Sequence, residues 1–243
     1  MQITRRNLMV AGVAASAAGA AIMDTKPVIA AEPSTGAPGK SKLTADQALA
    51  RLREGNRRFI ADEVNNSDIS RKARLGVAKG QGPFAALVGC ADSRVGPEHL
   101  FGAGLGDLFI VRTAGNYLSA AGLGSIEYAV AVLGVPLVVV LGHERCGAVA
   151  AAVDVVTKNA QFPGSIGTMV EPIIPAVIQA QQTLKPGGDL VDASIRANVA
   201  RVAKRLRTAS EPLMLDPIKA GKVRVVGATY DLDTGEVDFF DLA

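Results

Sequence analysis

The chain has 243 residues, of which 49% are apolar and 26 are glycine, which is ample for one well-buried domain and scarcely enough for two. Its formal net charge at pH 7 is only +3, so the charge balance does not argue for nucleic acid as a partner. Only two cysteines and two histidines occur, so any metal or thiol site must be built from a very short list of residues.

The N-terminus has the features of an export signal. Arg5 and Arg6 precede an uncharged run of mostly small residues over 8–23, and this arrangement resembles a twin-arginine signal. The run is short and weakly apolar for a membrane span, which needs roughly 20 strongly apolar residues. We therefore expect a cleavable signal peptide over 1–31, a flexible tether over 32–42, and a periplasmic or otherwise exported protein without a stable membrane anchor. The alternative is a disordered basic tail.

The remaining residues, 43–243, are expected to form one folded domain. Thr44, with Gln47 three residues later, predicts a capped helix that runs to about Glu63 and forms an N-terminal arm. Short apolar runs predict buried strands over 84–90, 108–111 and 137–141, with helices over 125–133 and 148–156 between and after them. This alternation is typical of crossover helices on a parallel sheet. The predicted fold class is α/β, with a central, mainly parallel β-sheet flanked by helices.

The C-terminal third continues the same pattern. Amphipathic helices are predicted over 171–184 and 192–209, followed by a strand over 223–230, a turn and a final strand over 237–240. The second helix carries five basic residues, which are Arg196, Arg201, Lys204, Arg205 and Arg207. We expect this cluster to be a solvated helix face, with an anionic partner as the alternative.

Three residues of types that commonly bind metals lie at the ends of two predicted strands. Cys90 ends the first strand, and His143 and Cys146 follow the third, at the edge where an open α/β sheet binds its ligands. Three protein ligands leave a fourth position open, which is the arrangement of a catalytic zinc ion. Cys146 also begins a helix, whose N-terminal dipole favours the thiolate that coordination needs.

A single disulfide is the alternative use of two cysteines in an exported chain. A disulfide would need neither a histidine three residues before Cys146 nor the Asp92 and Arg94 that follow Cys90. An ordinary surface ion pair is the corresponding alternative for Asp92 and Arg94. The residues next to the two cysteines in the sequence therefore favour a metal site over a disulfide.

The spacing of these residues resembles that of the β-class carbonic anhydrases, whose markers are a C-x-D-x-R segment and an H-x-x-C segment some fifty residues later. Further segments carry the same resemblance, and they are 106–112, 114–116, 125–129 and 226–231. The resemblance covers about residues 43–242. It implies the reversible hydration of carbon dioxide to bicarbonate and a proton.

The resemblance also implies one Zn²⁺ per subunit, with Cys90, His143 and Cys146 as its ligands. Asp92 and Arg94 would form a dyad in which Arg94 orients Asp92 and Asp92 accepts a hydrogen bond from the zinc-bound hydroxide. In some relatives the aspartate becomes a fourth zinc ligand in a closed, inactive state, so Asp92 has two expected roles. Two thiolates neutralise the charge of the metal, so the bound water should be less acidic and activity should rise into the alkaline range.

His99 is a candidate proton shuttle, but a lone histidine after Pro97 and Glu98 is more often an ordinary helix residue. The residues that bind the substrate are unknown. The resemblance implies a homodimer or a higher homo-oligomer. Another two-Cys, one-His zinc enzyme and a non-catalytic zinc-binding protein are the competing functions.

Overall fold

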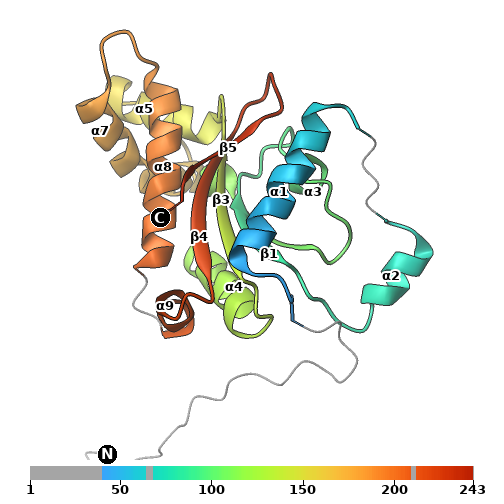
Figure 1. Cartoon of the computed structure of the whole chain (residues 1–243). Coiled ribbons are helices and arrows are strands. Elements are labelled where there is room, and N and C mark those ends of the chain that lie inside the picture. The colour runs from blue at the N-terminus through green and yellow to red at the C-terminus, as the bar shows by residue number, and fades with distance from the viewer. Residues whose placement is uncertain (1–39, 64–67, 209–211, 243) are drawn as a thin grey trace, which may run out of the picture. The chain divides into compact units, whose positions relative to one another are not determined.

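The structure is a computed structural model, and it describes residues 40–63, 68–208 and 212–242. Within these residues one five-stranded sheet has the strand order β2-β1-β3-β4-β5 (Figure 1). The strands are β1 (Ala85–Gly89), β2 (Leu108–Arg112), β3 (Leu137–His143), β4 (Arg224–Tyr230) and β5 (Val237–Asp241). Strands β1 to β4 pair in parallel, and β5 is antiparallel to β4. The predicted α/β class with a mainly parallel sheet is confirmed.

Helices cover both faces of this sheet (Figure 1). They are α1 (Ala45–Ile60), α2 (Arg71–Val77), α3 (Pro97–Leu100), α4 (Ala120–Ala131), α5 (Gly147–Lys158), α6 (Ser165–Val170), α7 (Ile174–Thr183), α8 (Leu190–Arg207) and α9 (Pro212–Lys219), with 3₁₀ turns η1 (Ala114–Asn116) and η2 (Glu171–Ile173). The predicted helices over 148–156, 171–184 and 192–209 correspond to α5, to η2 with α7, and to α8.

The side chains of each buried strand alternate between two hydrophobic layers. Leu87 of β1 packs in the layer that contains Leu52 of α1. Ala86 and Val88 point to the opposite layer, which contains residues of α4, α8 and α9 such as Ile126. Because both faces are covered, β1 and β3 are buried along their whole length, as their continuous apolar runs predict.

Helix α1 begins where its capping residues predict. The Thr44 hydroxyl accepts a hydrogen bond from the backbone N–H of Gln47, and the Gln47 side chain accepts one from the backbone N–H of Thr44. This reciprocal capping box satisfies two backbone donors that the first turn leaves unpaired. The helix ends at Ile60, three residues before the predicted end near Glu63.

Two of the predicted elements need correction. The run 108–111 was predicted to be a buried strand, but β2 is only half-buried because it is the edge strand and pairs with β1 alone. The helix predicted over 125–133 begins at Ala120, because Ser119 caps it by accepting a hydrogen bond from the N–H of Gly122. Both errors concern where an element is placed or where it begins, not whether it exists.

The predicted signal peptide and almost all of the predicted tether lie outside the described residues. The domain boundaries at 31 and 42 therefore stay predictions. Among the helices that the structure describes, none combines the length and the apolar character needed to cross a membrane.

Candidate metal centre

The sheet topology brings Cys90, His143 and Cys146 together. Cys90 directly follows β1, His143 is the last residue of β3, and Cys146 caps the N-terminus of α5. Strands β1 and β3 are hydrogen-bonded neighbours and run in parallel, so their carboxyl ends lie at the same edge of the sheet. Arg145 lies between His143 and Cys146 and has a left-handed φ of 50°, a backbone conformation that few residues other than glycine adopt. It turns the chain sharply between the two cluster residues.

The three side chains form a buried cluster suited to a metal ion. Their ligand atoms lie within 4.8 Å of one another. Cys90, His143 and Cys146 are 4%, 0% and 1% exposed, which keeps the cluster out of bulk water. The two sulfur atoms are 3.9 Å apart, and a tetrahedral zinc ion with Zn–S bonds of about 2.3 Å would hold them about 3.8 Å apart. Both cysteines are free thiols, so the disulfide alternative is wrong for this structure.

The hydrogen bond of His143 determines which of its ring nitrogens can bind a metal. Nδ1 lies 2.8 Å from the carbonyl oxygen of Glu144, and because a carbonyl can only accept, Nδ1 carries the proton. Nε2 is then the nitrogen with a free lone pair in the neutral ring. It is fully buried and has no hydrogen-bond partner. A buried, unpaired acceptor is costly unless something occupies it, so the donor set fits Zn²⁺.

The two thiols share their protons unequally. A hydrogen bond from Cys146 is the main reason that the pKa of Cys90 falls to about 4, and the backbone amides of Asp92 and Gly115 lower it further. The pKa of Cys146 is raised, because it is the donor in that hydrogen bond and because it is buried. The cluster is therefore already built to hold negative charge on sulfur, the form that binds a metal.

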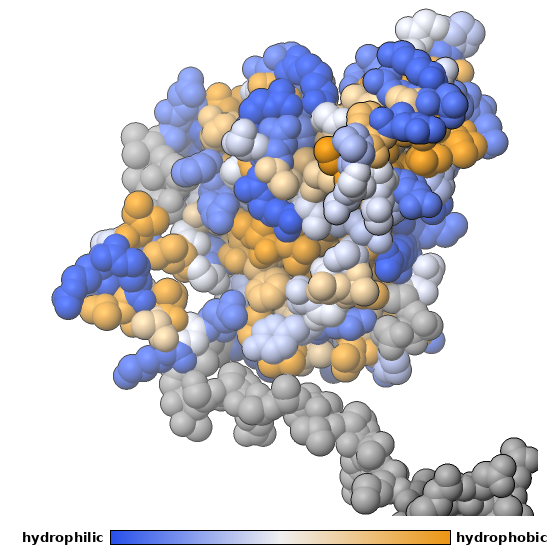
Figure 2. Space-filling view, turned by 180° about the vertical axis from the view of Figure 1, so that it is seen from behind, coloured by the Kyte–Doolittle hydropathy of each residue, from blue (hydrophilic) through white to orange (hydrophobic). Residues whose placement is uncertain are grey.

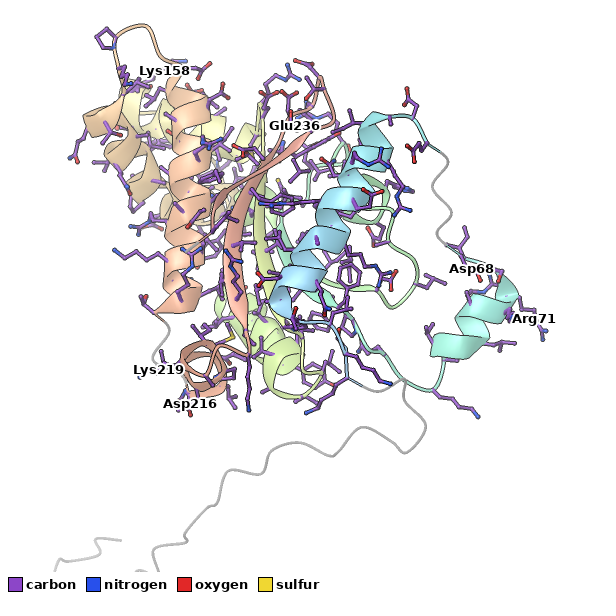
Figure 3. All side chains as sticks on the ribbon, viewed as in Figure 1. Asp68, Arg71, Lys158, Asp216, Lys219 and Glu236 are labelled. Atoms are coloured by element: carbon purple, nitrogen blue, oxygen red, sulfur yellow. The ribbon has the colours of Figure 1, made fainter. Side chains whose placement is uncertain are left out.

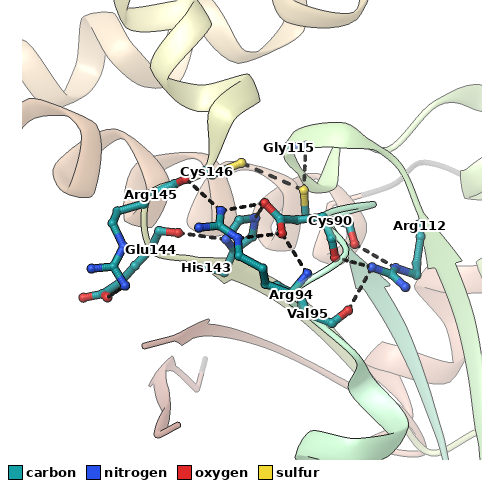
Figure 4. Close-up of polar contacts among 10 residues, drawn as sticks. Cys90, Arg94, Val95, Arg112, Gly115, His143, Glu144, Arg145 and Cys146 are labelled. Carbon is teal, nitrogen blue, oxygen red and sulfur yellow. Dashed lines mark hydrogen bonds and ion pairs between the residues drawn. The ribbon is translucent and has the colours of Figure 1, made fainter. Parts of the chain in front are cut away.

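Asp92 and Arg94 lie beside the cluster and hold each other in a two-point ion pair. Figure 4 shows Arg94 next to His143 and Arg145. Arg94 Nε donates to Asp92 Oδ1 at 3.0 Å, and Arg94 Nη2 donates to Asp92 Oδ2 at 2.8 Å. Nη2 also donates to the carbonyl oxygen of Arg145, which ties the pair to the loop between the ligands. The Arg94 hydrogen bond holds the pKa of Asp92 well below its usual range, so the carboxylate is ionised. Its Oδ2 lies 3.8 Å from Nε2 of His143.

Three further residues support Cys90, and no local sequence pattern predicted a role for them. Arg112, at the end of β2, donates to the backbone carbonyls of Cys90, Asp92 and Val95 and so holds the loop after β1 in place (Figure 4). The backbone N–H of Gly115 donates to the sulfur of Cys90 at 3.2 Å. The buried Asn198 of α8 donates to the carbonyl oxygen of Gly115 at 2.9 Å.

Only glycine fits at position 115. Its φ is +70°, and a Cβ there would lie 2.6 Å from Cδ1 of Ile173 and 3.1 Å from Cβ of Ala148. Arg112 and Gly115 lie in the segments 106–112 and 114–116, which carry the family resemblance. Membership of these segments was the sequence signal that could have identified them as functional residues. Asn198 had no such signal, because its partner lies 83 positions away in the chain.

The candidate His99 and the neighbouring Arg145 lie outside the cluster. His99 is an exposed residue of α3, in agreement with the expectation of an ordinary helix residue. Arg145 is exposed and forms a two-point ion pair with Asp233. The cluster and the Asp92–Arg94 pair therefore contain every residue that the sequence analysis placed in the site.

Comparison with known proteins agrees with this geometry. A family model described as carbonic anhydrase matches residues 85–237, a range that includes all three cluster residues and the Asp92–Arg94 pair. The chain belongs to the β-class carbonic anhydrase family. Carbonic anhydrase 2 of Mycobacterium tuberculosis is 43% identical over 76% of this chain and 87% of its own length. The carbonic anhydrase of Mycolicibacterium smegmatis is 39% identical over 83% of this chain and 94% of its own.

Solved β-carbonic anhydrases share the fold. A tetrameric enzyme of Sordaria macrospora matches with a TM-score of 0.60 and 27% identity, over 67% of this chain and 83% of that one. A Coccomyxa enzyme solved in complex with acetazolamide matches with a TM-score of 0.58 and 25% identity, over 79% and 86%. The protein is thus an enzyme, a carbonic anhydrase.

Proposed function

We propose that this carbonic anhydrase interconverts carbon dioxide and bicarbonate with one zinc ion per subunit, held by Cys90, His143 and Cys146. The observation that carries the proposal is the buried cluster of two sulfurs and one unpaired imidazole nitrogen next to an ionised carboxylate. When bound there, zinc supplies a nucleophilic hydroxide near neutral pH by lowering the pKa of water from about 15.7 toward about 7.

Asp92 and Arg94 orient the reaction in this proposal. Because Asp92 is ionised, it can only accept hydrogen bonds, so it would accept one from the attacking hydroxide and orient the hydroxide's lone pair toward carbon dioxide. Arg94 keeps the carboxylate in position through both of its oxygens. In a closed state, opening of this ion pair would free Asp92 to become a fourth metal ligand.

The test is stopped-flow carbon dioxide hydration by the zinc-quantified protein at about pH 7 and about pH 9, beside Asp92→Asn. We expect zinc-dependent activity that rises with pH and falls by about a hundredfold or more in the variant, because an amide can donate to the hydroxide and misorient it. Asp233→Asn is the matched control, since it removes a nearby carboxylate whose partner, Arg145, does not contact Asp92.

Two outcomes would contradict the proposal. Activity that survives in Asp92→Asn at full zinc content would remove Asp92 from the mechanism. A zinc-loaded protein that is inactive at both pH values would leave the fold and the metal site standing and would move the function to zinc binding.

We also propose that the enzyme is a homo-oligomer. The outer edge of β2 is unpaired among the described residues, and its apolar residues Leu108 to Val111 are only half-buried. Helix α2 buries none of its residues in its own chain, and Ile69 and Leu75 are 66% and 57% exposed. The face seen in Figure 2 has an apolar area at its centre. Edge strands and apolar surfaces of this kind favour contact with another chain. The similar Sordaria enzyme is tetrameric, which supports the proposal.

Finally, we propose export by the twin-arginine route, supported by Arg5, Arg6 and the weakly apolar run after them. Replacing both arginines by lysine keeps the charge but removes the pair that such signals require. We expect this Arg5→Lys/Arg6→Lys variant to stay in the cytoplasmic fraction, as measured by cell fractionation, while the unaltered chain is exported. Equal export of both chains would contradict the proposal.

A further inference from the structure

Four of the five basic residues of α8 are exposed, as the expected solvated helix face requires, and Arg207 is the exception. Arg196 pairs with Asp238 of β5 and stacks over the ring of Phe240. Arg207 is only 18% exposed in its side chain and pairs with Asp241 of β5. The other three cations, Arg201, Lys204 and Arg205, have no acidic partner within ion-pair distance among the residues that the structure describes, and they line a cavity.

This cavity lies between α8, η2, the first turn of α7 and the segment after η1. Its volume is about 560 Å³, which falls within the usual range of about 300–1,000 Å³ for small-molecule sites. It is lined by Tyr117, Pro172, Pro175, Asn198, Arg201, Val202, Lys204, Arg205 and Thr208. None of these residues belongs to the metal cluster or to the Asp92–Arg94 pair.

The lining has the composition of a site for a negatively charged ligand. Arg201 is three residues before Lys204 and four before Arg205, so the three cations share one helix face and repel one another. The negative end of the helix dipole favours Lys204 and Arg205 in the last turn, but it does not explain why all three line one cavity. Arg205 donates to the carbonyl oxygen of Leu118, which keeps one guanidinium at the wall.

The other walls combine polar and apolar residues. The Asn198 amide donates to the carbonyl oxygen of Gly115, and the Thr208 hydroxyl donates to that of Lys204. The three cations therefore supply the contacts that suit an oxyanion, and Tyr117 with Val202 forms an apolar wall. Arginine and lysine bind carboxylate and phosphate oxygens through charge-assisted hydrogen bonds.

We propose that this cavity is a second binding site, separate from the metal centre, for a small polyanion that carries phosphate or carboxylate groups. Such a ligand would neutralise three cations that the chain itself leaves unpaired. Its affinity falls as salt is added, because the cations are exposed and their attraction is screened.

Inorganic phosphate and citrate are the two probes, titrated by isothermal calorimetry at low ionic strength with sodium chloride as the control. A second readout reports on the site itself. The protein has no tryptophan and only three tyrosines, one of which, Tyr117, lines the cavity. We expect a ligand-dependent change in tyrosine fluorescence that is lost in Tyr117→Phe. Saturable binding of either probe supports the site, and binding of one probe without the other distinguishes phosphate from carboxylate ligands.

Charge variants separate this site from any binding of anions at the metal centre. Arg201→Gln/Lys204→Gln removes two cations of the cavity, and both side chains belong to exposed residues, so the fold is retained. Arg71→Gln/Lys72→Gln removes the same charge from α2, where Arg71 lies well away from α8 (Figure 3). We expect the first pair to weaken binding by about tenfold or more, and the second by less than about twofold.

Equal affinity in the two double variants would overturn the proposal, because the anion would then bind elsewhere or through net charge alone. Absence of saturable binding for both probes would overturn it as well. Hydration activity of the zinc enzyme is not needed for any of these measurements, so this site stands or fails separately from the proposed reaction.

Discussion

At the scale of single residues, the sulfur of Cys90 depends on a short chain of hydrogen bonds. Asn198 holds the carbonyl oxygen of Gly115, and the N–H of Gly115 points at the sulfur. Hydrogen bonds of this kind orient a metal ligand and tune its charge, so they affect metal affinity without touching the metal. Asn198 is therefore a positioning residue for Cys90, and it also lines the neighbouring cavity.

Replacing Asn198 by alanine tests this series of hydrogen bonds. We expect Asn198→Ala to weaken zinc retention against a chelator by about tenfold, because Gly115 is no longer held in place. The buried carbonyl oxygen of Gly115 also loses its side-chain partner, which costs about 1–3 kcal/mol in the free energy of unfolding.

Ser194→Ala provides the control for that variant. Ser194 is as deeply buried on the same helix, but its hydroxyl donates to Leu190 within α8 and does not contact the metal centre. We expect normal zinc retention and a stability change below about 1 kcal/mol. If both variants lose zinc equally, the effect comes from α8 packing and Asn198 has no specific role.

At the scale of elements, α8 is fastened to the end of the sheet by the ion pair between Arg207 and Asp241. The side chains are 18% and 17% exposed, and Arg207 also donates to the carbonyl oxygen of Val225 in β4. A second ion pair joins the same helix to the same strand, between Arg196 and Asp238, but its side chains are 48% and 55% exposed. Water and salt screen an exposed pair much more than a buried one.

The two aspartates of β5 should therefore differ in their contribution to stability. Asp241→Asn leaves a largely buried guanidinium without its counter-charge, and we expect it to lower the free energy of unfolding by roughly 1–3 kcal/mol. Asp238→Asn should cost less than about 1 kcal/mol. Urea denaturation of both variants provides the measurement. A larger loss from Asp238→Asn would contradict this ranking.

At the scale of the whole molecule, the catalytic domain leaves apolar surface that its own chain does not cover. Helix α2 has no buried residue, and in Figure 1 it lies apart from the helices that cover the sheet. A seven-residue helix with no fully buried residue is marginal in water by itself. Packing against another subunit would supply the missing contacts, in line with the proposed homo-oligomer.

Charged substitutions near α2 test this assembly. We expect Ile69→Glu/Leu75→Glu to lower the mass measured by light scattering to that of a smaller species, because two carboxylates cannot be buried in an apolar contact without a large cost. The far-ultraviolet circular dichroism should stay the same. Ile166→Glu/Ile178→Glu is the control, since these side chains are 48% and 45% exposed on α6 and α7. An unchanged mass in the first variant would exclude α2 from the interface.

Much of the domain could be predicted from local signals in the sequence. Continuous apolar runs identified β1 and β3, since a strand covered on both faces needs apolar residues throughout. The capping pair of Thr44 and Gln47 located the start of α1 to the residue. The members of the buried cluster could be predicted because two cysteines and two histidines left few combinations, and because ligands gather at the carboxyl ends of parallel strands.

Other features depended on contacts between distant parts of the chain. The edge position of β2, the pairing of Arg207 with Asp241 and the hydrogen bond from Asn198 to Gly115 all follow from the order in which strands and helices pack. Local patterns specify residue type and periodicity, but they do not say which face of one element meets which face of another. The sequence by itself therefore determined the fold class and the members of the metal cluster. Only the tertiary structure decided what supports Cys90 and which cations of α8 remain unpaired.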